Sequence, residues 1–244
     1  MIEKTMTENP VFCALDTQNP SRANQLAENL SPHIGGIKIG MEFFYATGLA
    51  GYQNLAATGL PIFLDLKLHD IPNTVAAAVS ALCPLQPAIL NVHAGGGLDM
   101  MRAASKAAKD TAAENDLTAP LIIAVTVLTS LEDDDLNLIG VNATPRDQVL
   151  RLADLAQQAD MGGVVCSAHE VEALRNQCGP DFKLIVPGIR PAGHATNDQK
   201  RIMTPEAALE AGADILVIGR AITQATDPVQ AASAISASLK SAKG

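Results

Sequence analysis

Short apolar runs that alternate with longer helix-compatible segments constrain the fold of this 244-residue chain more than any other feature. Each run has about the length of one strand, and its largely apolar character is typical of a strand covered on both faces. The runs therefore predict eight buried strands. These are expected at residues 11–15, 34–39, 61–66, 88–92, 121–127, 163–166, 183–186 and 215–218.

The segments between these runs are rich in Ala and Leu, which favour helices. Strand and helix alternate along the whole chain, and no linker rich in Pro or Ser divides it. This order predicts an α/β protein, a closed (β/α)8 TIM barrel rather than an open doubly wound sheet. We expect a single domain over residues 1–244, in which residues 1–10 form a short N-terminal extension. Helices are expected at residues 21–30, 74–82, 98–113, 146–159, 170–177 and 204–211.

The composition agrees with this fold and excludes some partners. Hydrophobic residues make up 48% of the chain but aromatic residues only 3%, so the core must be aliphatic, as suits helices packed on parallel strands. A net charge of -9 without a long basic run argues against a nucleic acid or an anionic membrane as partner. An anionic ligand would have to be met by local positive charges.

Neither the N-terminus nor any later segment has an apolar stretch of the length that a signal peptide or a membrane span needs. The four cysteines lack the spacing of a metal site or a disulfide framework, so we expect free thiols in a reducing cytoplasm. They are Cys13, Cys83, Cys166 and Cys178.

Polar residues gather where the predicted strands end. In a (β/α)8 barrel, the carboxyl ends of the strands form the face that carries the active site. Surface charge scattered at random would not follow strand ends in this way. The residues concerned are Asp16, Lys38, Asp65, Lys67, His93, Thr129, Ser130, Ser167, Arg190 and Arg220.

The third strand carries the densest group of charges. Asp65 and Lys67 lie two residues apart, so a strand would project them to the same side, and Asp70 follows closely. Charges inside an apolar core are costly unless they are paired. An isolated pair of this kind is equally consistent with a structural ion pair at a strand end.

The last two strands predict a phosphate site. Loops after the seventh and eighth strands of such barrels commonly bind phosphate through backbone N–H groups. Arg220 would add charge-assisted hydrogen bonds, and Gly219 would let the backbone come close. The alternative makes Gly219 a turn residue and Arg220 a solvated charge. Residues 191–205 form a long polar loop from which Gln199 could reach the ligand.

Two further polar features have structural interpretations. We expect His93 to be a hydrogen-bonded barrel residue rather than a metal ligand, and residues 95–97, all Gly, to form a strand-to-helix turn. The four acids at residues 132–135 predict a solvated loop or the start of a helix.

Several separated motifs, in order along nearly the whole chain, closely resemble orotidine 5'-phosphate decarboxylase of the bacterial type. Residues 65–74 read Asp-Leu-Lys-Leu-His-Asp-Ile-Pro-Asn-Thr, residues 187–191 read Pro-Gly-Ile-Arg-Pro, and residues 218–220 read Ile-Gly-Arg. Motifs that share one order are far more specific than any single one. Shorter matches lie at Asp16 in Ala-Leu-Asp, Lys38 in Gly-Ile-Lys-Ile-Gly, Thr129-Ser130 and Asp198-Gln199.

The resemblance implies conversion of orotidine 5'-monophosphate to uridine 5'-monophosphate and CO2, in de novo pyrimidine synthesis, without a metal or an organic cofactor. By resemblance, Lys67 donates the proton to C6, Asp65 lies near the departing carboxylate, and Lys38 with Asp70 completes a network of alternating charges. The other residues that the resemblance places at the substrate are Asp16 and Lys38 at the ribose, Thr129 or Ser130 at the pyrimidine, and Arg190, Gln199, Gly219 and Arg220 at the phosphate.

The resemblance also implies a homodimer whose active sites lie at the subunit interface. Asp70, Ile71 and Thr74 would reach the site from the partner subunit.

The residue types suit this chemistry. Loss of CO2 from C6 leaves a carbanion in the ring plane, where the π system cannot delocalise it, so a fixed cation is the available stabiliser. Acids on both sides favour the protonated form of Lys67, which argues against a Schiff-base role.

The enzyme alternative is a Mg-dependent sugar-phosphate decarboxylase or aldolase on a related barrel. Lys38 opposes it, because a cation there would crowd a metal site. The non-enzyme alternative is a phosphate-binding or regulatory barrel without catalysis.

Overall fold

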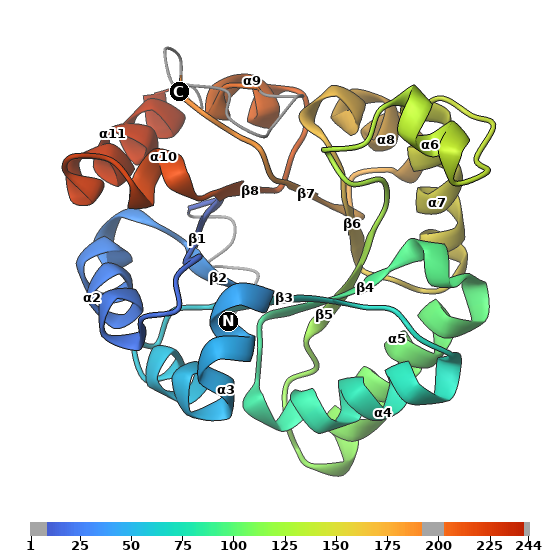
Figure 1. The fold of residues 1–244 in the computed structure, drawn as a ribbon, viewed down its shortest axis with the longest axis horizontal. Helices are drawn as coiled ribbons and strands as arrows, with labels where there is room; N and C mark the ends of the chain where they lie inside the picture. Colours follow the sequence, from blue (N-terminus) through green and yellow to red (C-terminus); the bar gives the residue numbers. More distant parts are fainter. Residues whose placement is uncertain (1–8, 192–202, 242–244) are drawn as a thin grey trace.

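The computed structural model describes residues 9–191 and 203–241. In that part of the chain, parallel strands follow one another around a closed barrel, each beside its neighbours in the sequence and the last beside the first. Figure 1 shows the ring of strands with helices on its outside. The predicted (β/α)8 TIM barrel is confirmed. The strands are β1 (Val11–Ala14), β2 (Gly36–Gly40), β3 (Ile62–Leu68), β4 (Ile89–His93), β5 (Leu121–Val125), β6 (Gly163–Val165), β7 (Lys183–Val186) and β8 (Ile215–Ile218).

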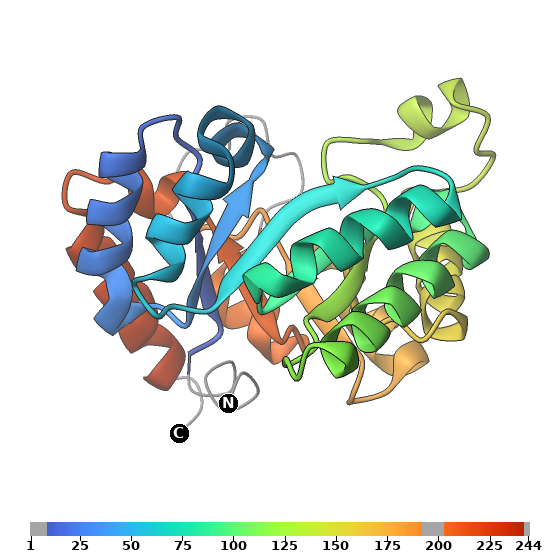
Figure 2. The same ribbon diagram turned by 90° about the horizontal axis from the view of Figure 1, so that it is seen from below.

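The helices confirm most of the expected positions and add others. The helix at Met41–Ala56 was not among the expected ones, and the acids of residues 132–135 begin a helix at Asp133. That short helix extends from the end of the barrel at which the strands finish (Figure 2). The helices are α2 (Pro20–Leu30), α3 (Met41–Ala56), α4 (Pro72–Leu82), α5 (Leu98–Glu114), α6 (Asp133–Leu138), α7 (Pro145–Gln158), α8 (Val171–Cys178), α9 (Pro205–Glu210), α10 (Arg220–Thr223) and α11 (Pro228–Ser241).

Three helices start in the same way. Asn19, Thr144 and Thr204 each precede a proline, and the side chain of each accepts a hydrogen bond from a backbone N–H in the first turn. The cap satisfies an N–H that has no partner within the helix, while proline fixes a helical φ where its missing N–H costs nothing. These pairs fix where α2, α7 and α9 begin.

Strand alternation divides the apolar side chains between two cores. Phe12 and Phe63 belong to a small core inside the barrel, whereas their neighbours Cys13 and Leu64 point outward and pack in the larger core that the helices cover. The same alternation turns every second residue of β2, β3 and β4 inward. Side chains above the inner core therefore face the carboxyl end of the barrel.

The thiols and the last residues before β1 are also placed. Cys13, Cys83 and Cys166 are buried and Cys178 is half-buried, and all four are free. The oxygen of Pro10 accepts a hydrogen bond from Leu216 N at 2.9 Å, so the end of the expected N-terminal extension joins the barrel. Residues 1–8 of that extension lie outside the described residues.

None of the helices in the described part of the chain combines the length and the apolar character that a membrane crossing requires.

Candidate active site

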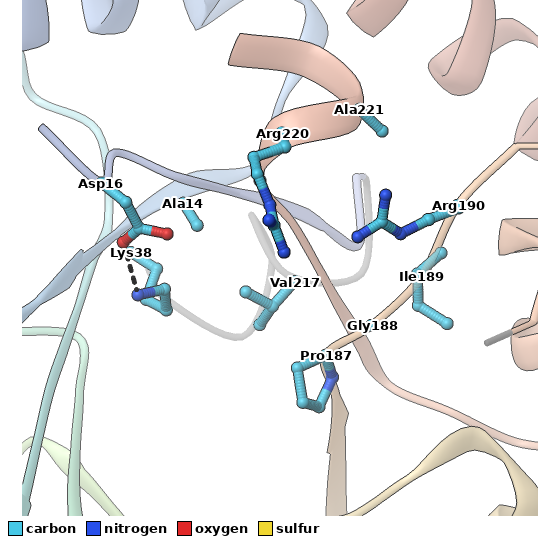
Figure 3. Close-up of a pocket in the computed structure, with 11 residues that line it drawn as sticks. Ala14, Asp16, Lys38, Pro187, Gly188, Ile189, Arg190, Val217, Arg220 and Ala221 are labelled. Carbon is cyan, nitrogen blue, oxygen red and sulfur yellow. Dashed lines mark hydrogen bonds and ion pairs between the residues drawn. The ribbon is translucent and has the colours of Figure 1, made fainter. Parts of the chain in front are cut away.

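A chain of alternating charges crosses the carboxyl end of the barrel. Lys38 Nζ lies 3.2 Å from Asp16 Oδ1 and 3.4 Å from Asp65 Oδ2, while Lys67 Nζ donates to Asp65 Oδ1 at 2.7 Å. Figure 3 shows Asp16 and Lys38 joined at the edge of a cavity. We call these four residues the charge network. It brings together residues from β2, β3 and the end of β1, which are neighbours in the barrel.

Burial and pairing act in opposite directions on this network. Burial disfavours the charge of Lys38, yet the carboxylates of Asp65 and Asp16 outweigh it and raise the pKa of Lys38. Burial likewise opposes the charge of Asp65, but Lys38, Lys67 and Asn91 outweigh it and lower the pKa of Asp65. Pairing therefore favours the ionised forms of Lys38 and Asp65 although both residues are buried, a place where charges without partners are costly.

Lys67 has an unusual backbone. Its φ is +53°, in the left-handed region that costs a side-chain-bearing residue about 1–2 kcal/mol. The strand pairing shifts at the same place, because Leu64 pairs with Leu90 but Leu68 pairs with Val92. Strain of this kind persists only where surrounding contacts hold it, and it is common at functional sites.

Asn91 of β4 is a site residue that sequence reasoning missed. Its side chain is fully buried, accepts a hydrogen bond from Lys67 N at 2.8 Å and donates one to Asp65 Oδ1 at 2.7 Å. A signal was present in the sequence, because an amide interrupts an otherwise apolar strand two residues before His93.

Asp70, Ile71 and Thr74 lie away from the charge network. All three are exposed: Asp70 and Ile71 lie at the turn between β3 and α4, and Thr74 lies in the first turn of α4. Asp70 Oδ1 accepts a hydrogen bond from Ile71 N at 2.7 Å. Within the described residues of one chain, Asp70 has no ion pair with the charge network. The four charges of one chain therefore include Asp16 in place of the expected Asp70. The prediction that these three residues act from a partner subunit stays a prediction.

Two adjoining cavities lie beside the network. The larger has a volume of about 320 Å³ and the smaller about 170 Å³. Lys38, Pro187 and Val217 line both, so the cavities meet beside the ammonium of Lys38. The larger cavity is also lined by Phe63, Asp65, Lys67, Val125, Val127, Leu128, Thr129, Ser130, Val165 and Cys166.

The smaller cavity carries two arginines. Arg190 and Arg220 point into it from the ends of β7 and β8 (Figure 3). Burial, together with the positive charge of Arg220, lowers the pKa of Arg190, so the guanidinium of Arg190 lies where its positive charge is disfavoured. An anion between them would relieve that repulsion and receive charge-assisted hydrogen bonds.

Gly219 keeps this cavity open. A Cβ at this position would lie 3.4 Å from the Cβ of Ala14 and 3.8 Å from Asp16 Oδ2, both of which line the cavity. A longer side chain would extend into the same space. Gln199 and most of the polar loop at residues 191–205 lie outside the described residues.

His93 differs from its expectation. Its Nδ1 is buried and has no hydrogen-bond partner among the described residues, and its ring stacks on His69 with centroids 5.3 Å apart. Burial, then the charges of His69 and Lys67, lower the pKa of His93. The expected strand-to-helix turn is found next to it, because Ala94–Gly96 form a short 3-10 helix before α5.

In the described part of the chain, no three side chains of His, Cys, Asp or Glu gather as a metal site would require.

Comparison with known proteins gives the family. Residues 9–235 match the model of the "Orotidine 5'-phosphate decarboxylase / HUMPS family". The chain belongs to this family. A relative from Rhodospirillum rubrum, named orotidine 5'-phosphate decarboxylase, is 54% identical over 96% of this chain and 95% of its own length. One of the same name from Paramagnetospirillum magneticum is 52% identical over 95% of this chain and 98% of its own length.

Solved structures agree with the sequence relatives. Orotidine 5'-phosphate decarboxylase from Lactobacillus acidophilus superposes with a TM-score of 0.83 at 39% identity, covering 95% of this chain and 99% of its own. The resemblance expected from the motifs is confirmed, and membership identifies an enzyme of the carboxy-lyase class.

Proposed function

We propose that this protein converts orotidine 5'-monophosphate to uridine 5'-monophosphate and CO2, the last step of de novo pyrimidine nucleotide synthesis, without a metal or an organic cofactor. One observation carries the proposal: an ammonium paired to a buried carboxylate lines a cavity whose neighbour holds two arginines. The relatives that carry this activity in their names support it.

The arginine cavity suits the phosphate. We assign Arg190 and Arg220 to the phosphate oxygens, Gly219 to the close approach of the backbone, and Gln199 to a contact from the polar loop. The larger cavity would take the pyrimidine, with Thr129 or Ser130 at its polar edge. The ribose would lie where the two cavities meet, within reach of Asp16 and Lys38.

The charge network suits the reaction at C6. The bond between C6 and the carboxylate breaks, its electron pair stays on C6, and CO2 leaves. The ammonium of Lys67 stabilises that pair and then gives a proton to C6, which yields uridine 5'-monophosphate and leaves a neutral amine that solvent reprotonates. Asp65 holds the ammonium before charge develops, so the stabilisation needs no rearrangement. Binding energy from the distant phosphate would contribute to the reaction at C6.

Lys38 supports chemistry without a metal. Its ammonium lies between the carboxylates of Asp16 and Asp65, where a divalent cation bound by these acids would have to lie. The network therefore already contains the positive charge that a magnesium ion would supply to a related sugar-phosphate enzyme.

We also propose a homodimer with active sites at the subunit interface. Ile71 is 67% exposed beside Asp70, and α3 carries the exposed apolar side chains of Met41, Tyr45 and Leu49. Large exposed apolar side chains near a site are typical of an interface. In such a dimer, Asp70, Ile71 and Thr74 of one subunit would complete the site of the other.

The proposal takes residues 1–244 as one barrel domain and the cytoplasm as its compartment, where free thiols persist. Nucleic acid and membranes are not proposed as partners, in line with the net charge of -9.

The test is an assay of the purified protein with orotidine 5'-monophosphate, followed as loss of the orotate ultraviolet absorbance, with and without EDTA. We expect equal turnover in both. Absence of turnover would overturn the proposed reaction. Turnover that stops with EDTA and returns with magnesium would instead favour the metal-dependent alternative.

A further inference from the structure

Asn91 stands opposite the irregular part of β3. Between the pairs Leu64–Leu90 and Leu68–Val92, Asn91 is the one β4 residue that faces Asp65, Leu66 and Lys67. The backbone of β4 cannot pair regularly with all of these residues, so a side chain can serve as a partner. The amide of Asn91 does so, because its Oδ1 accepts from Lys67 N at 2.8 Å.

The other end of the same amide contacts the charge network. Asn91 Nδ2 donates to Asp65 Oδ1 at 2.7 Å, and this oxygen also accepts from Lys67 Nζ at 2.7 Å. The orientation of the amide is forced, because a backbone N–H can only donate and a carboxylate can only accept. One fully buried side chain therefore holds both the backbone of Lys67 and the carboxylate that Lys67 pairs with.

We propose that Asn91 is a positioning residue, whose buried amide holds Asp65 and the left-handed backbone of Lys67 together and so fixes the Lys67 ammonium at the reacting carbon. The inference rests on the proposed function, because that ammonium is the proposed proton donor. Asn91 has no assigned contact with the substrate and acts through the other two residues.

Only a side chain with a donor at one end and an acceptor at the other fits this place. Leu has a similar shape but would leave Lys67 N and one lone pair of Asp65 without partners. An ionised Asp could still accept from Lys67 N, but it would face the Asp65 carboxylate with a like charge. A protonated Asp could accept from Lys67 N and donate to Asp65, as the amide does.

The contrast between an ionised and a protonated Asp at position 91 gives a test that distinguishes a positioning residue from a merely structural one. For N91D we expect kcat at neutral pH to fall by about 10- to 100-fold, the usual effect of losing a supporting contact. Its kcat should rise as the pH falls and the new carboxyl becomes protonated, whereas the wild type should show no such rise. The Kd for uridine 5'-monophosphate should stay unchanged, because Arg190 and Arg220 are intact.

The matched control is Ser105→Ala on α5. Ser105 is also buried, and its hydroxyl donates a hydrogen bond to the backbone oxygen of Asp160 at 2.8 Å, away from the site. Losing this bond should lower the unfolding temperature, as we also expect for Asn91→Leu (N91L), but it should leave kcat and its pH dependence unchanged.

A second measurement separates this inference from the proposed function. Amide hydrogen exchange at Lys67, read by NMR in the ligand-free protein, should be faster in N91L than in the wild type and unchanged in Ser105→Ala. If the wild type shows no decarboxylation, the proposed function fails, but the exchange result still tests whether Asn91 holds Lys67.

Unchanged exchange in N91L, or wild-type kcat and pH dependence in N91D, would each overturn the positioning role. Should N91L not fold, N91A replaces it in the exchange measurement, because Ala also lacks the acceptor for Lys67 N. The pH dependence of kcat in N91D, which has nearly the same shape as the wild type, tests the positioning role independently.

Discussion

Asp65 Oδ1 accepts a hydrogen bond from the Lys67 ammonium at 2.7 Å, at a place where the pairing of β3 with β4 is irregular. The carboxylate and the amine are therefore held together by a specific backbone geometry rather than by regular strand alternation. Since the same carboxylate also faces Lys38 at 3.4 Å, Asp65 lies between two cations. Removal of any one of these charges changes the environment of the other two.

Lys67→Ala should lower kcat by at least about 1,000-fold, because both the stabilising charge and the proton donor are lost. Isothermal titration with uridine 5'-monophosphate should give a Kd close to the wild type, since the arginine cavity is unchanged. Lys109→Ala is the control, because Lys109 forms an exposed ion pair with Asp160 away from the site. Substantial turnover by Lys67→Ala would show that the proton comes from another group.

Arg220→Ala should raise KM for orotidine 5'-monophosphate by about 10- to 100-fold, the effect of losing one charge-assisted hydrogen bond. Steady-state kinetics provide the measurement, and Arg151→Ala on the exposed side of α7 is the control. Orotidine without its phosphate should react equally slowly with the variant and the wild type. If the variant handled this nucleoside worse than the wild type does, Arg220 would act beyond the phosphate.

Mixing two inactive variants tests the shared site. In a dimer that contains one Lys67→Ala subunit and one Asp70→Ala subunit, one site lacks both residues and the other has both. Random mixing after unfolding and refolding should therefore restore about one quarter of the wild-type activity. If Asp70 acted within its own chain, the mixture would stay inactive.

The charge network should make stability depend on pH at both extremes. The pKa of Asp65 is lowered in the folded protein, so its stabilisation is complete above the unfolded value of about 4 and is lost as the pH falls further. The pKa of Lys38 is raised, so its stabilisation is complete below about pH 10.5 and is lost as the pH rises further. Urea unfolding across the pH range measures both effects.

Asp65→Asn should lower the unfolding free energy at neutral pH by about 3–5 kcal/mol, because it leaves two buried or half-buried ammonium groups near each other. It should also flatten the acid limb of the stability curve. Asp110→Asn, which removes one half of an exposed pair on α5, should leave the curve nearly unchanged. An acid limb in Asp65→Asn as steep as that of the wild type would assign the acid dependence to other carboxylates.

The sequence predicted the barrel because its signals are local and repeated. Apolar runs of strand length recur between Ala-rich segments, and a closed ring buries every run. The same logic predicted the proximity of Asp65 and Lys38, since inward residues at the ends of adjacent strands meet. The helix α3 gave a weaker signal, because glycine is a poor helix former and Gly48, which takes a positive φ, lies inside it.

What could not be predicted depends on contacts between distant segments. The left-handed φ of Lys67 has no signature in its own residue type, and it is held by Asn91 from another strand. The missing hydrogen bond at His93 Nδ1 likewise depends on which groups surround it in three dimensions. The proposed role of Asp70 requires a second chain, which no single-chain pattern specifies.

The backbone of Lys67 has a consequence for how this enzyme responds to selection. A φ of +53° suits glycine, so Lys67→Gly should be more stable than Lys67→Ala and should unfold at a higher temperature. The difference in unfolding free energy should be about 1 kcal/mol after the greater chain entropy of glycine is allowed for. Directed evolution of Lys67→Ala for heat tolerance alone would therefore favour glycine at the position where the proposed mechanism requires lysine. Only a screen that also demands turnover would select lysine there.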